Sequence, residues 1–176
     1  MNRSQFHHTI RAAGAILGEN KLLVIGSQAI HASINRLFPE AAQSIEIDIS
    51  SLVDEDGSKA DLIDGSIGEM SLFQDTFGYY AQGVTPKTAV LPIGWRKRLI
   101  PYQHSETNGV TAMCLEPHDL WISKAIAGRE KDWGYCNALL KRKLVEVETL
   151  IDRLKKIKDI HPDIKSKILT KLEAYS

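Results

Sequence analysis

Apolar residues at the start of the chain follow the period of an α-helix. Four of them recur at intervals of three or four residues, which places them on one side of a helix: Phe6, Ile10, Ala13 and Leu17. Gly18 supplies a stop, because glycine readily adopts the left-handed conformation that ends many helices. The pattern predicts an opening amphipathic helix, followed by a short buried strand at the continuously apolar run 22–25.

A regular alternation marks residues 44–50, Ser-Ile-Glu-Ile-Asp-Ile-Ser. Successive side chains of a strand point to opposite faces, so the three isoleucines share one face and Glu46 and Asp48 share the other. Between this strand and the first, apolar residues from Ala29 to Leu37 predict a helix that Pro39 closes.

Further along, the pattern predicts a helix near 60–67 and strands near 88–91, 98–103 and 110–115. These elements and the two earlier strands favour an α/β (α+β) fold with a small mixed sheet and flanking helices over residues 1–115.

From Glu116 onward the apolar period is helical throughout. Pro117 suits the first turn of a helix, and an apolar stripe extends from Leu139 to Ile157 before His161-Pro162 separates a final short helix. We expect residues 116–176 to form a helical region that completes the site and ends in a helical tail.

Charge is balanced overall but unevenly placed. The 176 residues carry 22 basic and 22 acidic side chains, so the whole molecule is not a polycation built to coat nucleic acid. Residues 1–119 hold 9 basic and 14 acidic side chains, whereas residues 120–176 hold 13 and 8. A solvated, lysine-rich helix surface is the simpler explanation, and a basic flank that contacts an anionic partner is the alternative.

The cysteines and the N-terminal residues indicate the cellular compartment in which the protein is expected. Cys114 and Cys136 are far apart and form no Cys-x-x-Cys pair, which argues against zinc or a disulfide framework and fits a reducing environment. The first ten residues lack the apolar core of a signal peptide, and no run of about 18 apolar residues exists to span a membrane. We expect a cytoplasmic protein without a membrane segment.

The first candidate for chemistry is the turn Gly26-Ser27, which follows a strand and precedes a predicted helix. Glycine lets the backbone approach a ligand closely, and a helix N-terminus offers N–H groups to an anion. Many such turns bind nothing, so this signal alone is weak.

Glu46 and Asp48 add what the turn lacks. Their backbones lie about 7 Å apart on one face of a strand, so both carboxylates can reach one divalent cation. Magnesium usually binds through one or two carboxylates, and substrate phosphate oxygens complete its coordination. The pair therefore suits a magnesium-bound nucleoside triphosphate, although a strand with one solvated face explains the same pattern.

The segments Leu23-Val24-Ile25-Gly26-Ser27 and Glu46-Ile47-Asp48 resemble the glycine-serine and paired-carboxylate motifs of the polymerase-beta-like nucleotidyltransferases. The segment 115–132, from Leu115-Glu116-Pro117 to Glu130-Lys131-Asp132, resembles the lysine and aspartate motifs of minimal nucleotidyltransferases. Members of that group are toxins of abortive-infection and type IV toxin–antitoxin systems. The resemblance covers residues 20–140 and is closer still to an uncharacterised branch.

Carried over by position, the resemblance implies a nucleotidyltransferase-like fold and a set of site residues. Gly26 and Ser27 bind the triphosphate, Glu46 and Asp48 hold Mg²⁺, Lys124 contacts phosphate, and Asp132 completes the catalytic set. An eight-residue helical spacing would point Lys124 and Asp132 to nearly the same face. The implied reaction is transfer of a nucleoside monophosphate from a magnesium nucleotide to an RNA or protein acceptor, with an antitoxin as a partner.

Glu46 occupies a position where the family usually has aspartate, and the spacing from Gly26 to Glu46 is longer than is common. This departure motivates an alternative, a catalytically degenerate protein that binds a nucleotide or only a partner. A third hypothesis is an assembly module that self-associates through its amphipathic tail.

Overall fold

The computed structural model describes residues 1–175. By their contacts these residues group into two compact units. The first comprises Met1–Thr88 with Leu99–Leu115, and the second comprises Ala89–Arg98 with the chain from Glu116 onward.

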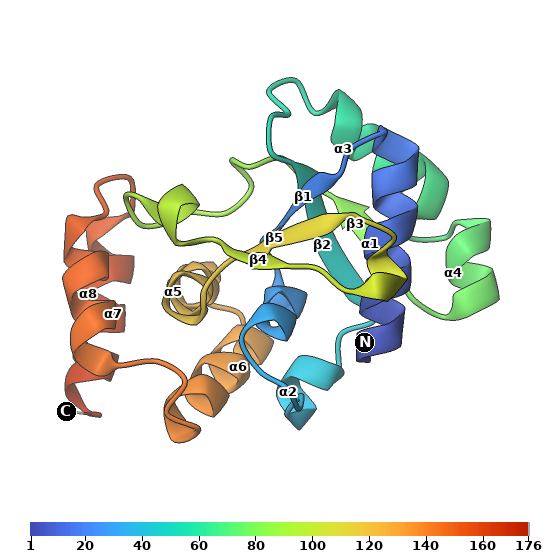
Figure 1. Ribbon diagram of the computed structural model, residues 1–176. Coiled ribbons are helices and arrows are strands. Elements are labelled where there is room, and N and C mark those ends of the chain that lie inside the picture. The colour runs from blue at the N-terminus through green and yellow to red at the C-terminus, as the bar shows by residue number, and fades with distance from the viewer. Residues whose placement is uncertain (176) are drawn as a thin grey trace. The chain divides into compact units, whose positions relative to one another are not determined.

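A five-stranded mixed sheet forms the centre of the first unit (Figure 1). The strand order is β3-β2-β1-β5-β4, with β1 antiparallel to β2 and parallel to β5. β3 runs parallel to β2, and β4 runs antiparallel to β5. The predicted small mixed sheet is confirmed, and its strands are β1 (Lys21–Val24), β2 (Glu46–Ser51), β3 (Tyr80–Gly83), β4 (Ile100–Tyr102) and β5 (Thr111–Cys114).

Helices α1 (Arg3–Leu17) and α3 (Ser58–Ile67) pack against each other, and both contact β2 (Figure 1). Gly18 ends α1 in the left-handed conformation, with φ of 64°, as predicted. Ile47 and Ile49 of β2 are fully buried. By alternation, Glu46 and Asp48 lie on the opposite face of β2, and the parallel register places Tyr80 and Gln82 of β3 beside them.

The predicted helix between the first two strands is wrong. Ser27–Ala32 form the 3₁₀ helix η1, and Pro39 does not close a helix but opens the four-residue α2 (Pro39–Ala42). Proline suits the first position of a helix because a backbone N–H there would have no acceptor within the helix, so proline loses no hydrogen bond. The chain leaves the helical path after η1, where the Arg3 guanidinium donates to the carbonyls of His31, Ile34 and Asn35.

The predicted strand at 88–91 is also wrong. The Thr88 N–H donates to the Thr85 carbonyl within a turn, and prolines 86 and 92 flank the segment and offer no N–H to a ladder. No pattern in the sequence predicted β3 or the short helix α4 (Leu72–Phe77). The remaining short 3₁₀ helices are η2 (Trp95–Arg98) and η3 (Ser105–Thr107).

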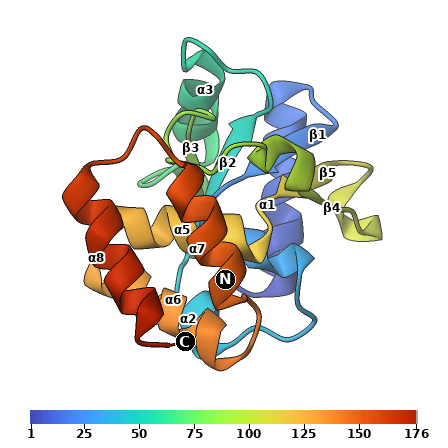
Figure 2. The ribbon, with the colours of Figure 1, turned by 90° about the vertical axis from the view of Figure 1, so that its left-hand side faces the viewer.

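The second unit contains the four helices of the predicted C-terminal helical region (Figure 2). They are α5 (Pro117–Ala127), α6 (Glu130–Lys141), α7 (Val147–Lys156) and α8 (Pro162–Glu173). The apolar stripe from Leu139 to Ile157 is divided between α6 and α7, because Lys143 adopts a positive φ of 54° and ends the helical path.

A buried ion-pair network attaches the segment 89–98 and α7 to α5. The Asp119 carboxylate is fully buried and accepts two hydrogen bonds from Arg98, at 2.8 and 3.0 Å. Arg153 of α7 bonds to Asp119 at 2.8 Å and also to Glu116. Burying an unpaired carboxylate would be strongly destabilising, and the ion pairs of this network offset that cost for Asp119.

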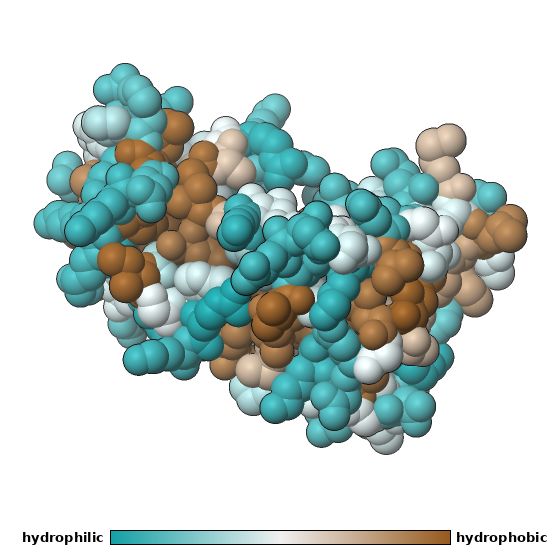
Figure 3. Space-filling model, turned by 90° about the horizontal axis from the view of Figure 1, so that it is seen from above, coloured by the Kyte–Doolittle hydropathy of each residue, from teal (hydrophilic) through white to brown (hydrophobic). Residues whose placement is uncertain are grey.

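Exposed apolar side chains are unevenly distributed. On the face seen in Figure 3, apolar residues appear as separate patches between hydrophilic ones. The most exposed large apolar side chains are Met70 and Leu72, at 88% and 84%, in the connection from α3 into α4. Met70 directly follows Glu69, and Leu72 lies three residues after it.

Candidate functional site

The Gly26-Ser27 turn and Asp48 meet at the end of β1. A Cβ atom placed on Gly26 would lie 1.5 Å from Oδ2 of Asp48, so any larger residue would displace this carboxylate. Gly26 has φ of −89° and ψ of −167°, which every residue can adopt; the requirement for glycine is therefore steric. The Ile25 N–H also donates to the Asp48 carbonyl at 3.3 Å. The fold thus places a carboxylate directly against the predicted phosphate-binding turn.

Buried side chains of η1 hold the Gly26-Ser27 turn in place. Gln28 is fully buried and donates to the Ala41 carbonyl of α2 at 3.0 Å. His31 is buried against Phe6, with ring centroids 4.4 Å apart. Burial and the nearby Arg3 charge lower the pKa of His31 to about 3, so its ring is neutral and supplies no cation to the turn.

Glu46 lies two residues before Asp48 on the same face of β2. Its carboxylate accepts a hydrogen bond of 2.9 Å from the Tyr80 hydroxyl of β3. Burial, together with this hydrogen bond, raises the pKa of Tyr80 well above its ordinary value. Tyr80 therefore stays protonated and holds one oxygen of Glu46 in place.

A cavity of about 260 Å³ opens at Glu46. Two further carboxylates line it, and the lining residues are Glu46, Asp64, Glu69, Tyr80 and Gln82. Asp64 accepts the Gly83 N–H at 2.6 Å, which orients its carboxylate beside β3. Three carboxylates around one cavity create a negative potential that favours a cation.

These residues fit a hard divalent cation. Carboxylate oxygens are the donors that Mg²⁺ prefers, and one or two of them suffice where a substrate phosphate supplies the rest. The contact between Asp48 and Gly26 brings a carboxylate next to the backbone that would hold that phosphate. The donor set is therefore appropriate for a magnesium nucleotide and inappropriate for a soft metal.

Lys124 and Asp132 form a pair in the second unit. The Lys124 ammonium lies 3.2 Å from Oδ1 of Asp132, and Arg129 contacts both carboxylate oxygens, at 2.6 and 3.3 Å. Asp132 is fully buried. Burial raises the pKa of Asp132, but the Arg129 hydrogen bonds and the Lys124 charge outweigh this effect and hold the pKa below its ordinary value. Asp132 is thus an ionised anchor for two cations.

The pairing of Lys124 with Asp132 arises differently from the expected single helix face. α5 ends at Ala127, Gly128 adopts a left-handed φ of 71°, and Arg129 is the N-cap of α6. Lys124 therefore projects from the end of one helix and Asp132 from the first turn of the next. The Lys124 ammonium also lies 4.7 Å from the centroid of the Tyr135 ring.

The structure thus joins the predicted site residues in two groups. Gly26, Ser27, Glu46 and Asp48 belong to the first unit, and Lys124 and Asp132 to the second. The sequence alone did not indicate the other residues of the cavity at Glu46, namely Asp64, Glu69, Tyr80 and Gln82. The inward positions Ala60, Ile63 and Ile67 of α3 leave Asp64 on the outer side, which was a usable signal.

Among residues 1–175, one group of three potential metal ligands has its ligand atoms converging on a single point, and it lies away from the paired carboxylates. Ligand atoms of His7, His104 and Glu106 lie within 4.8 Å of one another. His7 already bonds to Glu106 at 2.5 Å and to the Tyr102 hydroxyl at 2.7 Å. Its ring stacks on His104 at 4.4 Å. Nitrogen donors and saturated hydrogen bonds make this group unlike a magnesium nucleotide site.

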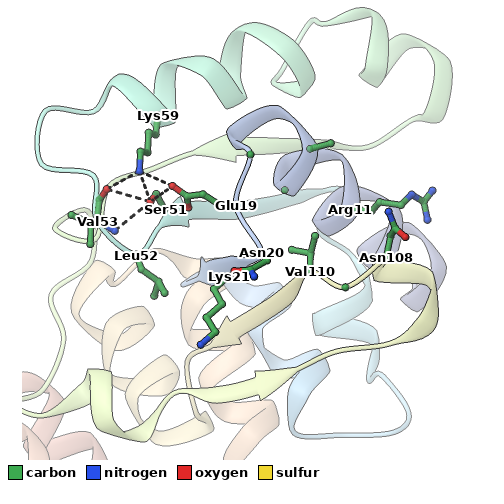
Figure 4. A pocket seen from close by; sticks show the side chains of 14 residues that line it. Arg11, Glu19, Asn20, Lys21, Ser51, Leu52, Val53, Lys59, Asn108 and Val110 are labelled. Atoms are coloured by element: carbon green, nitrogen blue, oxygen red, sulfur yellow. Dashed lines mark hydrogen bonds and ion pairs between the residues drawn. The ribbon is translucent and has the colours of Figure 1, made fainter.

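A larger cavity, of about 840 Å³, lies at the opposite end of β1 from the Gly26-Ser27 turn (Figure 4). At one end of it, Lys59 bonds to Glu19 at 2.6 Å and to Ser51 at 3.2 Å. The hydrogen bond to Glu19 raises the pKa of Lys59. Because Lys21 starts β1 and Gly26 follows its end, this cavity is separate from the paired carboxylates.

Paired carboxylates on a strand beside a glycine-serine turn are the arrangement expected from the resemblance to nucleotidyltransferases. A family model described as "Nucleotidyltransferase of unknown function (DUF6036)" matches residues 5–175. The chain belongs to this family.

No curated protein and no solved structure matches the chain significantly. Among residues 1–175, no helix combines the length and apolar character needed to cross a bilayer.

Proposed function

We propose that the chain is an active nucleotidyltransferase that transfers a nucleoside monophosphate from a magnesium-bound nucleoside triphosphate to an RNA or protein hydroxyl. The observation that carries the proposal is the contact of Asp48 with Gly26. It places a carboxylate beside the Gly26-Ser27 turn, where Asp48 would hold a metal ion that also binds the nucleotide phosphate. Family membership supports the reaction class.

In the proposed reaction, the acceptor hydroxyl oxygen bonds to the α-phosphorus of the nucleotide. The bond from that phosphorus to the bridging oxygen breaks, pyrophosphate leaves, and the hydroxyl proton passes to water. Bound Mg²⁺ supplies charge stabilisation to the phosphate oxygens. The backbone at Gly26 and the Ser27 hydroxyl bind the triphosphate, and Glu46 and Asp48 hold the metal.

The family resemblance assigns Lys124 to the phosphate, where its charge stabilises the transition state. Asp132 then acts as a positioning residue, because both of its oxygens are engaged by Lys124 and Arg129. An ionised, doubly paired carboxylate is a poor proton acceptor, so its role is to orient the Lys124 ammonium.

The direct test incubates the protein with each labelled nucleoside triphosphate, magnesium and either total RNA or a protein extract. We expect label in one acceptor class and released pyrophosphate in stoichiometric amount. Absence of transfer from all four nucleotides, while a known family relative is active under the same conditions, contradicts the proposal. A toxin role predicts in addition that expression of the wild-type chain arrests growth and that Asp48→Asn relieves the arrest.

One observation favours a second candidate, a nucleotide-binding protein without transfer. Glu46 stands where aspartate is usual, and Tyr80 holds one of its oxygens. A displacement of a metal ligand by about 1 Å can reduce a rate by about a hundredfold. Calorimetry tests for this nucleotide-binding protein. It should show that the wild type binds a magnesium nucleotide and that Asp48→Ala does not, and transfer assays should show no activity.

A further inference from the structure

A third cavity, of about 310 Å³, lies within the helical second unit. α6 and the end of the chain around α8 supply most of its wall. The lining residues are Trp121, Trp133, Asn137, Leu140, Lys171, Leu172, Ala174 and Tyr175. Its volume is at the lower end of the range for small-ligand sites.

The wall of this cavity combines an aromatic surface with a cation. The Trp133 side chain is half-buried, and the Lys171 ammonium lies 4.7 Å from its ring centroid. Trp121 supports Trp133 edge-on, with centroids 6.1 Å apart at 83°. Trp121 is itself almost fully buried and donates its indole N–H to the Cys136 carbonyl, so Trp133 is held on a rigid base.

Polar groups complete the wall. The Tyr175 hydroxyl donates to the Asn137 amide oxygen at 3.0 Å. Tyr175 is 50% exposed, so this amide lies near solvent and can exchange its partner for one on a ligand. An aromatic face beside an amide and an ammonium matches the flat, hydrogen-bonding chemistry of a nucleobase.

The second unit, which holds the cavity, is cationic. The second unit carries sixteen basic and ten acidic side chains, whereas the first unit carries six and twelve. Lys141, Arg142 and Lys143 directly follow Leu140 of the cavity wall and are exposed. Lys167, also exposed, precedes Lys171 by one helical turn on α8. This charge is complementary to a phosphate backbone.

We propose that this cavity binds one unpaired base of single-stranded RNA, which stacks on Trp133 while neighbouring phosphates contact Lys171 and the cations at the end of α6. The inference rests on the proposed function in one respect. Of the two acceptor classes proposed there, RNA and protein, it selects RNA. Lys171 moves from the Trp133 ring to a phosphate when the base enters, since its flexible side chain reaches both.

The test is fluorescence anisotropy with a labelled single-stranded RNA dodecamer, titrated with the full chain in the absence of nucleotide and magnesium. We expect Trp133→Ala to weaken binding about tenfold, the effect of losing one base-stacking contact. Trp133→Phe retains a stacking surface and should lose no more than about threefold. Lys171→Gln should reduce the slope of log affinity against log salt by about one.

Trp95→Ala is the matched control. Trp95 is also a half-buried tryptophan of the second unit with a cation over its ring, Arg96 at 4.7 Å, but it does not line this cavity. It should bind RNA as the wild type does. Circular dichroism confirms that each variant is folded, and the reduced salt slope of Lys171→Gln still tests the cavity if Trp133→Ala unfolds.

Two probes separate base stacking from charge. An abasic dodecamer and a poly-glutamate peptide carry negative charge without bases. Both should bind at least tenfold more weakly than the RNA and be insensitive to Trp133→Phe and Trp133→Ala. Equal binding of either probe, or wild-type RNA affinity in Trp133→Ala, overturns the proposal; Trp133-dependent capture of the peptide would indicate an acidic protein partner instead.

The failure of this inference is distinguishable from failure of the proposed function. RNA binding that depends on Trp133, without any nucleotide transfer, overturns only the transferase activity. Transfer to a protein hydroxyl without RNA binding overturns only the RNA inference. Asp48→Asn should bind the dodecamer with unchanged affinity, because Asp48 is not part of this cavity.

Discussion

Oxygen Oδ2 of Asp48 occupies the space where a side chain at residue 26 would begin, 1.5 Å from the position of a Cβ atom on Gly26. The residue type at position 26 thus controls where a carboxylate of the candidate metal site can lie.

Gly26→Ala should abolish transfer while the protein stays folded. The added methyl group forces the Asp48 carboxylate to move by more than 1 Å, and we expect transfer to fall by at least about a hundredfold. The unfolding free energy should change by no more than about 2 kcal/mol, because the backbone at Gly26 is unstrained for alanine. Transfer assays and thermal unfolding measure the two effects. Gly134→Ala, in open space within α6, should instead stabilise by about 1 kcal/mol and retain activity.

Metal affinity should depend on Asp48 and not on His7. We expect Asp48→Asn to weaken Mn²⁺ binding at least about tenfold in the presence of a nucleotide, since it removes one charged oxygen ligand. Electron paramagnetic resonance of free Mn²⁺ gives the affinity. His7→Ala, in the nitrogen-containing group, serves as the control and should bind Mn²⁺ as the wild type does. Chelation should abolish transfer, and added Mg²⁺ should restore it; transfer that survives chelation would count against the magnesium assignment.

Lys124→Met should separate catalysis from stability. Arg129 continues to pair with Asp132, so the buried carboxylate keeps a partner and the unfolding free energy should fall by only about 1 kcal/mol. Loss of the phosphate contact should reduce transfer by about a hundredfold or more. Steady-state kinetics and urea unfolding measure the two effects. Lys131→Met removes the same charge from an exposed neighbour and should leave transfer intact; similar losses in both variants would refute the role of Lys124.

Tyr80 should remain protonated through the range where exposed tyrosines ionise. Burial raises the pKa of Tyr80, and ionised Glu46 raises it further by accepting its hydrogen bond. A raised folded-state pKa contributes stability below the unfolded-state value of 10.0, and that contribution is lost as the pH rises through the folded-state value. Tyrosinate absorbance near pH 10.5 should therefore be the same in the wild type and Tyr80→Phe. A deficit of one tyrosinate in the variant would show that Tyr80 ionises normally.

Acid should weaken the network around Glu116. Burial raises the pKa of Glu116, but hydrogen bonds from His118 and Arg153 outweigh it and lower the pKa from 4.5 to about 2. This stability is present above the unfolded-state value and is lost as the pH falls through the folded-state value. Between pH 5 and 2 the wild type should lose on the order of 2 kcal/mol relative to Glu116→Gln, after allowance for solvent screening. Urea midpoints of the two proteins across this range provide the measurement, and parallel curves would contradict it.

The sequence was most informative where one local pattern determines the structure. The alternation at 44–50 predicted β2 and the shared face of Glu46 and Asp48, because a two-residue period has only one interpretation over seven residues. The helix at residues 3–17 was equally clear, since Gly18 marks its end.

The sequence was least informative where distant residues decide the conformation. The segment after Ser27 has a helical apolar pattern, but Arg3 binds the carbonyls of Ile34 and Asn35, and the chain turns away. Similarly, β3 is short and gains its place from pairing with β2, which no local pattern encodes. Asp64 and Glu69 were missed as part of the candidate site because the packing of α3 against β3, rather than a local pattern, brings them beside Glu46.

The segment 89–98 has a consequence for dissecting the protein. The chain leaves the first unit after Thr88, returns at Leu99, and leaves again after Leu115, so the two units share three covalent connections. A fragment ending at Leu115 would carry Arg98 without Asp119, and a fragment starting at Glu116 would contain Asp119 without Arg98. Each would hold half of a buried ion pair. Separate study of the units therefore requires a circularly permuted chain or co-expressed fragments in which residues 89–98 are kept together with helices α5 to α8.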